Sequence, residues 1–178
     1  SLLVYPDATV GVDAFLEGLA TEDAHVLYGS YPPTGGMGAI PDAILGKFGP
    51  ADLASALRPY FHSTPALVDP FAAMLKHEVP PDGAPPLPED AFQSVTVHLM
   101  RALAAEKPLL WVVEDLHSAD SGRRRLLLSL GRAAAGHRVL LLLTTRPGGV
   151  PADEAALLAR IDAFQRTSLA RLGAREVV

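Results

Sequence analysis

Short apolar runs alternate along this chain with longer segments in which apolar residues recur at helical spacing. The runs have strand length and end at proline, glycine or charged residues, so they predict strands over residues 2–5, 25–28, 108–113, 139–144 and 165–169. No charged residue interrupts the runs at 108–113 and 139–144. Such unbroken runs are typical of parallel strands that are covered on both faces.

The segments between these runs predict helices over residues 12–20, 40–48, 51–61, 67–77, 89–105, 118–135 and 152–163. Glycine and proline predict a loop over 30–38 and an exposed connection over 79–88. Strands that alternate with helices favour right-handed crossovers and a parallel sheet. The sequence therefore predicts an α/β fold in one domain, residues 1–178, with helices on both faces of the sheet and a helical, proline-rich insert over about 39–106.

The composition narrows the class of protein. Hydrophobic residues make up 49% and charged residues 20%, as in a globular domain, and the net charge of -5 argues against a non-specific grip on nucleic acid. The basic run 123–125 precedes leucines 126–128 on a predicted amphipathic helix; contact with nucleic acid or an acidic partner is one interpretation, and a solvated helix face is the favoured prediction. No apolar run has the ~20 residues that cross a bilayer. Because the sequence begins without methionine and residues 172–178 read as the start of a helix, we expect a piece of a longer polypeptide.

Two carboxylates follow the apolar run at 108–113, where a buried strand emerges from the sheet. Glu114 and Asp115 come directly after this run. Ligands of open α/β sheets bind at the carboxyl ends of the strands. A hydrophobic strand followed by paired acids is the Walker B pattern, in which one carboxylate holds the water shell of Mg²⁺ and its neighbour orients the attacking water. The alternative is that the pair simply ends a strand and begins a turn.

Further polar residues end the next apolar run. Thr144, Thr145 and Arg146 lie at the predicted edge of the sheet that also carries the two acids. A hydroxyl there can hydrogen-bond a water or a phosphate oxygen, and a guanidinium can neutralise a terminal phosphate. Alone, these residues are also compatible with a strand that ends in a turn.

Taken together, the two strand ends resemble a known family. EDLHSAD at 114–120 and LLLLTTRPGG at 140–149 are similar to the ATPase core of bacterial multidomain regulators. This core belongs with the signal-transduction (STAND-type) ATPases related to the AAA and Orc-like group. The common form reads roughly LVLEDLHWAD, so Ser118 departs from the usual tryptophan. The resemblance covers essentially the whole chain and implies a three-layer P-loop NTPase-like core that uses ATP with Mg²⁺.

The resemblance also implies a role for each polar residue at the two strand ends. Glu114 and Asp115 match the Walker B acids, with Glu114 on the metal side and Asp115 as the candidate base. Thr144, Thr145 and Arg146 fill the sensor-1 position. Thr144 is expected to contact the nucleotide, and Thr145 and Arg146 are expected to join the acids in catalysis.

The phosphate-binding loop of this family is degenerate in this chain. Family members read approximately LLVSGEAGIGKSRLVDEFL, and this chain reads LLVYPDATVGVDAFL from residue 2. Pro6 replaces the first glycine and removes an N–H donor, Thr9 replaces an inner glycine, and Gly11 matches the last one, a nucleotide-binding position. The lysine and the hydroxyl residue after it are missing. In an alternative alignment Ser1 follows the motif lysine, which then lies upstream. Both alignments predict weak or absent ATP binding.

Three hypotheses for function follow. The first is an ATP-dependent switch module of a cytoplasmic multidomain regulator, in which ATP hydrolysis stays an open question. Its partners are then a helical lid beyond residue 178, helical repeats, and kinase, cyclase or DNA-binding effector domains, with no membrane or direct nucleic-acid contact. The second is a pseudo-ATPase that keeps the fold as an interaction or scaffolding domain. The third is an unrelated hydrolase that uses a metal held by the acid pair.

Overall fold

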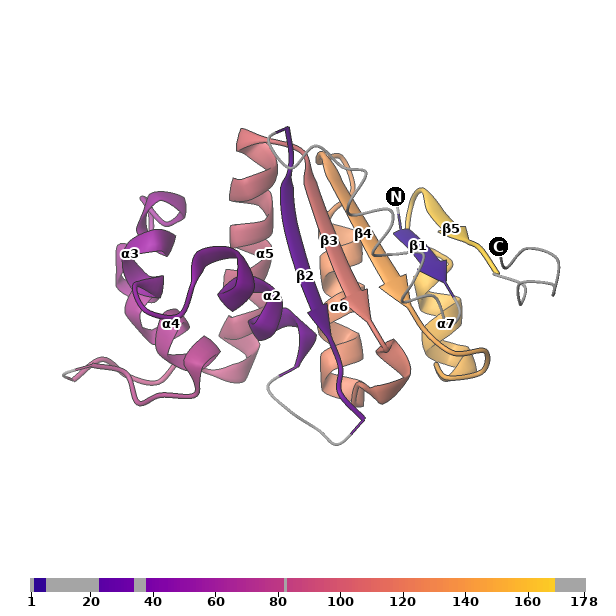
Figure 1. Cartoon of the computed structure of the whole chain (residues 1–178), viewed down its shortest axis with the longest axis horizontal. Coiled ribbons are helices and arrows are strands. Elements are labelled where there is room, and N and C mark those ends of the chain that lie inside the picture. Colours follow the sequence, from indigo (N-terminus) through magenta and orange to yellow (C-terminus); the bar gives the residue numbers. More distant parts are fainter. Residues whose placement is uncertain (1, 6–22, 34–37, 82, 169–178) are drawn as a thin grey trace, which may run out of the picture.

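The computed structural model describes residues 2–5, 23–33, 38–81 and 83–168. Within these ranges five parallel strands form one sheet in the order β2-β3-β4-β1-β5 (Figure 1). The strands are β1 (Leu2–Tyr5), β2 (His25–Ser30), β3 (Leu109–Glu114), β4 (Val139–Thr144) and β5 (Phe164–Arg166). Each predicted strand is present, so the α/β class and the parallel sheet are confirmed. Because all the strands are parallel, their carboxyl ends share one edge.

A layer of helices within the described ranges lies along one face of the sheet. These are α5 (Glu89–Glu106), α6 (Ser121–Ala133) and α7 (Ala152–Leu158), which stand behind the strands in Figure 1. Helix α2 (Ala39–Phe48) packs against β2, while α3 (Leu53–Leu57) and α4 (Val68–Lys76) lie beyond that edge of the sheet. The helix predicted over 12–20 falls outside the described residues. We call the side with α5, α6 and α7 the helical face and the other side the second face.

Alternation along the central strands divides the apolar core between these two faces. Leu109, Trp111 and Val113 join the large cluster formed with the helices. Leu110 and Val112 join Leu142 of β4 in a smaller cluster on the second face, where all three are at most 5% exposed. Burial on both faces explains why the sequence of β3 shows no polar alternation.

Several predicted boundaries are wrong by a few residues, each for a local reason. Strand β2 continues to Ser30, because that residue still pairs with Glu114. Helix α6 begins at Ser121, because the Asp120 side chain accepts a hydrogen bond from the Arg123 N–H at 2.8 Å and caps it. Helix α7 ends at Leu158, five residues early; Ala163 has a φ of 59°, outside the helical range, just before β5.

Arg124 joins α6 to α7, so the prediction that run 123–125 is a solvated face is wrong at this position. Its guanidinium donates to both carboxylate oxygens of Glu154 and to the backbone oxygen of Ala119. The side chains of Arg124 and Glu154 are each only 16% exposed. A bidentate arginine–carboxylate ion pair of this kind is well suited to a site that excludes most water.

We expect Arg124→Gln to lower the free energy of unfolding by about 2 to 3 kcal/mol, because Glu154 is left with little water and no cation. Chemical denaturation followed by circular dichroism measures this change. Arg125→Gln is the matched control: it removes the neighbouring, exposed charge and should change stability by less than about 0.5 kcal/mol. Equal effects of the two substitutions would contradict the structural role of Arg124.

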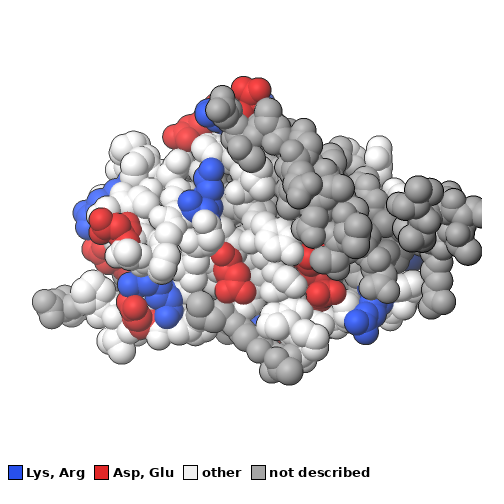
Figure 2. Space-filling model, in the orientation of Figure 1, with Lys and Arg blue, Asp and Glu red and all other residues white. Residues whose placement is uncertain are grey.

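The charged surface of the described residues is mixed in sign. On the face seen in Figure 2, acidic and basic side chains are interspersed and form no continuous basic patch. Non-specific binding to the nucleic-acid backbone requires such a patch. None of the helices in the described ranges is both long and apolar enough to span a bilayer.

Candidate functional site

The structure brings Glu114, Asp115 and Thr144 together at the carboxyl edge of the sheet; we call this group the acid edge. Glu114 ends β3 and Thr144 ends the neighbouring β4, and each is 5% exposed. The Thr144 hydroxyl oxygen accepts a hydrogen bond from the backbone N–H of Asp115 at 3.2 Å. The second acid is thereby tied to the adjacent strand.

Asp115 turns the chain sharply as it leaves the sheet. Its backbone is left-handed, with φ 56° and ψ 41°, a conformation that aspartate tolerates better than most residues. The 3₁₀ turn Leu116–Ser118 follows, and its Ser118 N–H donates to the Asp115 backbone oxygen at 2.8 Å. The Asp115 side chain remains 47% exposed. Uncommon backbone conformations of this kind recur at functional sites.

Two hydroxyl groups from β2 contact the acids, and the sequence analysis missed both. The Tyr28 hydroxyl donates to Glu114 Oε2 at 2.5 Å, and the Ser30 hydroxyl donates to Asp115 Oδ2 at 3.3 Å. The register explains these contacts, since Ser30 lies opposite Glu114 and Tyr28 lies two residues earlier on the same face. The signal in the sequence is the spacing of two hydroxyl residues at the end of an apolar run.

We expect Tyr28→Phe to lower the free energy of unfolding by about 1 kcal/mol. The lost hydrogen bond ends on a carboxylate, but Tyr28 is 41% exposed, so water partly replaces the hydroxyl. Urea denaturation of both proteins measures the difference. Tyr60→Phe is the control, because the Tyr60 hydroxyl also donates to a carboxylate, that of Glu106, but at 3.4 Å and in an exposed position. A loss as large in the control as in Tyr28→Phe would contradict a specific role for the Tyr28–Glu114 contact.

The acid edge belongs to the second face of the sheet. Glu114 continues the alternation of Leu110 and Val112, and Thr144 continues that of Leu142. The Glu114 and Thr144 side chains therefore lie on the side opposite α5, α6 and α7. This is the side that faces the reader in Figure 1.

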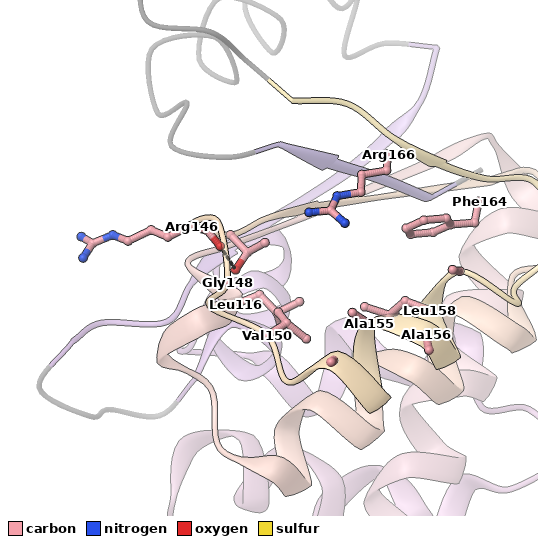
Figure 3. Close-up of a pocket in the computed structure, with 12 residues that line it drawn as sticks. Leu116, Arg146, Gly148, Val150, Ala155, Ala156, Leu158, Phe164 and Arg166 are labelled. Atoms are coloured by element: carbon pink, nitrogen blue, oxygen red, sulfur yellow. Dashed lines mark hydrogen bonds between the residues drawn. The ribbon is translucent and has the colours of Figure 1, made fainter.

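The remaining predicted site residues do not join the acid edge in the same way. The Thr145 hydroxyl donates to the backbone oxygen of Arg146 at 3.3 Å, so it is engaged locally. The Arg146 side chain is exposed and makes no hydrogen bond or ion pair with the described residues; in Figure 3 it points outward. Gly11, the predicted nucleotide-binding glycine, lies outside the described residues.

A partly buried histidine completes the surroundings of the acids. His117 Nδ1 is 3.9 Å from Asp115 Oδ1, and this nitrogen is buried and makes no hydrogen bond with the described residues. Buried polar atoms normally have a partner, so the hydrogen-bonding capacity of this nitrogen is unused beside Asp115. No group of three or more acidic or histidine side chains within the described ranges is arranged to hold a metal ion by itself.

The chain was compared with family models, curated proteins and solved structures, and nothing in these three comparisons matches it.

Proposed function

We propose that this chain is the nucleotide-binding core of a regulatory P-loop-type ATPase and that its acid edge binds ATP with Mg²⁺ weakly. The observation that carries this proposal is the convergence of Glu114, Asp115 and Thr144 at the carboxyl end of two adjacent parallel strands. The motifs EDLHSAD and LLLLTTRPGG, through their resemblance to signal-transduction ATPases, point to the same chemistry.

The strand order supports this proposal. Strand β4 lies between β1 and β3, so the end of β4 stands between the exit of β1 and the acids. A residue that contacts both a terminal phosphate and its attacking water must occupy this intermediate position. Thr144 does so, and the exposed Arg146 is within the same connection. The phosphate-binding loop would leave β1, which is where the degenerate motif begins.

The residues of the acid edge fit Mg²⁺ that is held through a nucleotide, and not Mg²⁺ alone. Mg²⁺ usually takes one or two protein carboxylates, with waters and phosphate oxygens as its other ligands. The acid edge supplies two adjacent carboxylates and no third acid. Glu114 would hold the water shell of the ion, which neutralises the phosphates when bound. Asp115 would orient a water, with its backbone held by Thr144.

Weak binding follows from the positions of the lysines. Lys47 lies in the last turn of α2, Lys76 lies in the last turn of α4, and Lys107 precedes β3 at the opposite edge of the sheet. These are the lysines of this sequence, and none stands where it can reach a phosphate at the acid edge. A lost charge-assisted contact of about 1.5 to 3 kcal/mol weakens binding by about 10- to 150-fold.

Thermal unfolding tests the proposal with ATP alone, Mg²⁺ alone and both together, each at about ten times an expected dissociation constant of roughly 1 mM. Mass action then gives about 1.4 kcal/mol, which is a rise in Tm of about 3 to 6 °C. We expect this rise in Tm only when ATP and Mg²⁺ are both present. The rise should be lost in Glu114→Gln. An equal rise with Mg²⁺ alone, or none in any condition, would overturn the proposal.

The missing lysine also favours a second candidate, a pseudo-ATPase that keeps the α/β fold as an interaction or scaffolding domain. In this case the Tyr28 and Ser30 hydroxyls satisfy the two acids permanently. The absence of any nucleotide-dependent rise in Tm, from protein that is folded, would support this second function. In both cases we place the chain in a cytoplasmic regulator, beside a helical lid and effector domains of the same polypeptide.

A further inference from the structure

A separate cavity of about 510 Å³ lies on the helical side, between α7, the connection 145–150 and β5 (Figure 3). Its size falls in the range of small-molecule sites in proteins. It is bounded by Leu116 and Val150 at one end and by Phe164 at the other. None of the described residues that line it is an aspartate or a glutamate.

The apolar side chains that line this cavity favour an apolar ligand. Helix α7 contributes Ala155, Ala156 and Leu158, and the alanines leave room because their side chains are short. The ring of Phe164 and the side chain of Val150 add further apolar surface. A polar ligand body would lose its hydration here and find few hydrogen-bonding partners.

A guanidinium adds a positive charge to these apolar walls. Arg166 extends from β5 toward the cavity in Figure 3, whereas Arg146 points away from it. Arg166 is exposed and forms no ion pair with the described residues. An arginine beside an apolar cavity that lacks acids favours a ligand whose head group is an anion.

The cavity and the acid edge are different sites, although they are neighbours in sequence. Glu114 and Thr144 point to the second face, whereas α7 covers the helical face. Leu116 follows Asp115, and Thr145 follows Thr144, so two lining residues adjoin the acid edge. Gly149 fixes this junction: a Cβ built on it would lie 2.5 Å from His117 Cβ.

We propose that this cavity binds a small carboxylate with an apolar body, of the size of a medium-chain or aromatic acid. The apolar body fills the space beside α7, and the carboxylate pairs with Arg166. This inference does not rest on nucleotide binding at the acid edge. Through Leu116 and Thr145 an occupant of the cavity contacts the segments that carry the two acids.

Titration calorimetry of the full chain with octanoate, octan-1-ol and octylammonium tests this proposal, with octan-1-ol kept below its solubility and the two ions kept below the concentration at which they form micelles. We expect octanoate to bind more tightly than the other two probes. Arg166→Gln should weaken octanoate about tenfold and leave octan-1-ol unchanged. Arg160→Gln is the matched control, because it removes an exposed charge near the end of α7 that does not line the cavity.

Ala155→Phe fills the cavity from α7 and is expected to abolish octanoate binding, with circular dichroism used to verify that the variant is folded. Arg166→Gln keeps the proposal testable if this variant does not fold, because Arg166 is exposed. Equal affinities for the three probes in the wild-type chain, no octanoate binding, or the same octanoate affinity in Arg166→Gln and the wild type would each overturn the proposal.

Discussion

Replacement of Gly29 by alanine is expected to lower the free energy of unfolding by about 3 to 5 kcal/mol. Gly29 lies in β2, and the first residue of α2 passes directly over it. A Cβ on Gly29 would lie 1.9 Å from the Ala39 backbone oxygen, 2.7 Å from its carbonyl carbon and 2.9 Å from its Cα. These are backbone atoms, so the clash is relieved only if α2 moves away from the sheet.

Gly46→Ala provides the matched control for Gly29→Ala. Gly46 lies within α2, and a Cβ built on it would meet no atom within 4 Å. Alanine should therefore stabilise the fold by about 0.5 to 1 kcal/mol, because it favours the helix more than glycine does. Chemical denaturation of both variants and the wild type measures these changes in the free energy of unfolding. A loss below about 1 kcal/mol in Gly29→Ala would contradict the close packing of α2 on β2.

Trp111→Ala is expected to cost about 3 to 5 kcal/mol, because it removes the largest fully buried side chain at the centre of the sheet. Trp111 is 0% exposed and lies opposite Leu27 on one neighbouring strand and Leu141 on the other. Because this is the single tryptophan of the chain, unfolding of the variant is followed by far-ultraviolet circular dichroism.

Trp111→Phe should cost much less, about 1 kcal/mol. The Trp111 indole N–H is buried and makes no hydrogen bond with the described residues. Phenylalanine removes this unsatisfied donor, which offsets part of the cost of the smaller side chain. A cost of Trp111→Phe equal to that of Trp111→Ala would contradict an unpaired indole.

The sequence predicts the strands of this fold well, because their signal is local. Runs such as 109–113 are apolar throughout, since both faces of the strand are buried. Element ends are predicted less well, because they depend on individual contacts. Helical periodicity continues past Leu158, yet α7 stops there, and the chain takes a left-handed residue, Ala163, to enter β5. Alanine rarely adopts this conformation, so the sequence gives no indication of the turn.

The candidate site was predictable in part for the same physical reason. Glu114, Asp115 and Thr144 stand at the ends of recognisable strands, and parallel strands bring their carboxyl ends to one edge. The Tyr28–Glu114 contact was not predictable from the spacing of the two hydroxyl residues alone, since it also requires knowing that β2 neighbours β3 and in which register. Arg146 shows the converse: a side chain only two residues beyond a strand end can still point into solvent.

Calorimetric titration with ATP, in the presence and absence of Mg²⁺, tests the central claim most directly. The proteins are the wild-type chain, Glu114→Gln and the control Asp153→Asn, whose carboxylate lies in the first turn of α7. Weak binding at the acid edge predicts a Mg²⁺-dependent dissociation constant of roughly 0.1 to 1 mM, lost in Glu114→Gln and kept in Asp153→Asn. Absence of binding by folded protein, or binding that changes neither on removal of Mg²⁺ nor in Glu114→Gln, would contradict it.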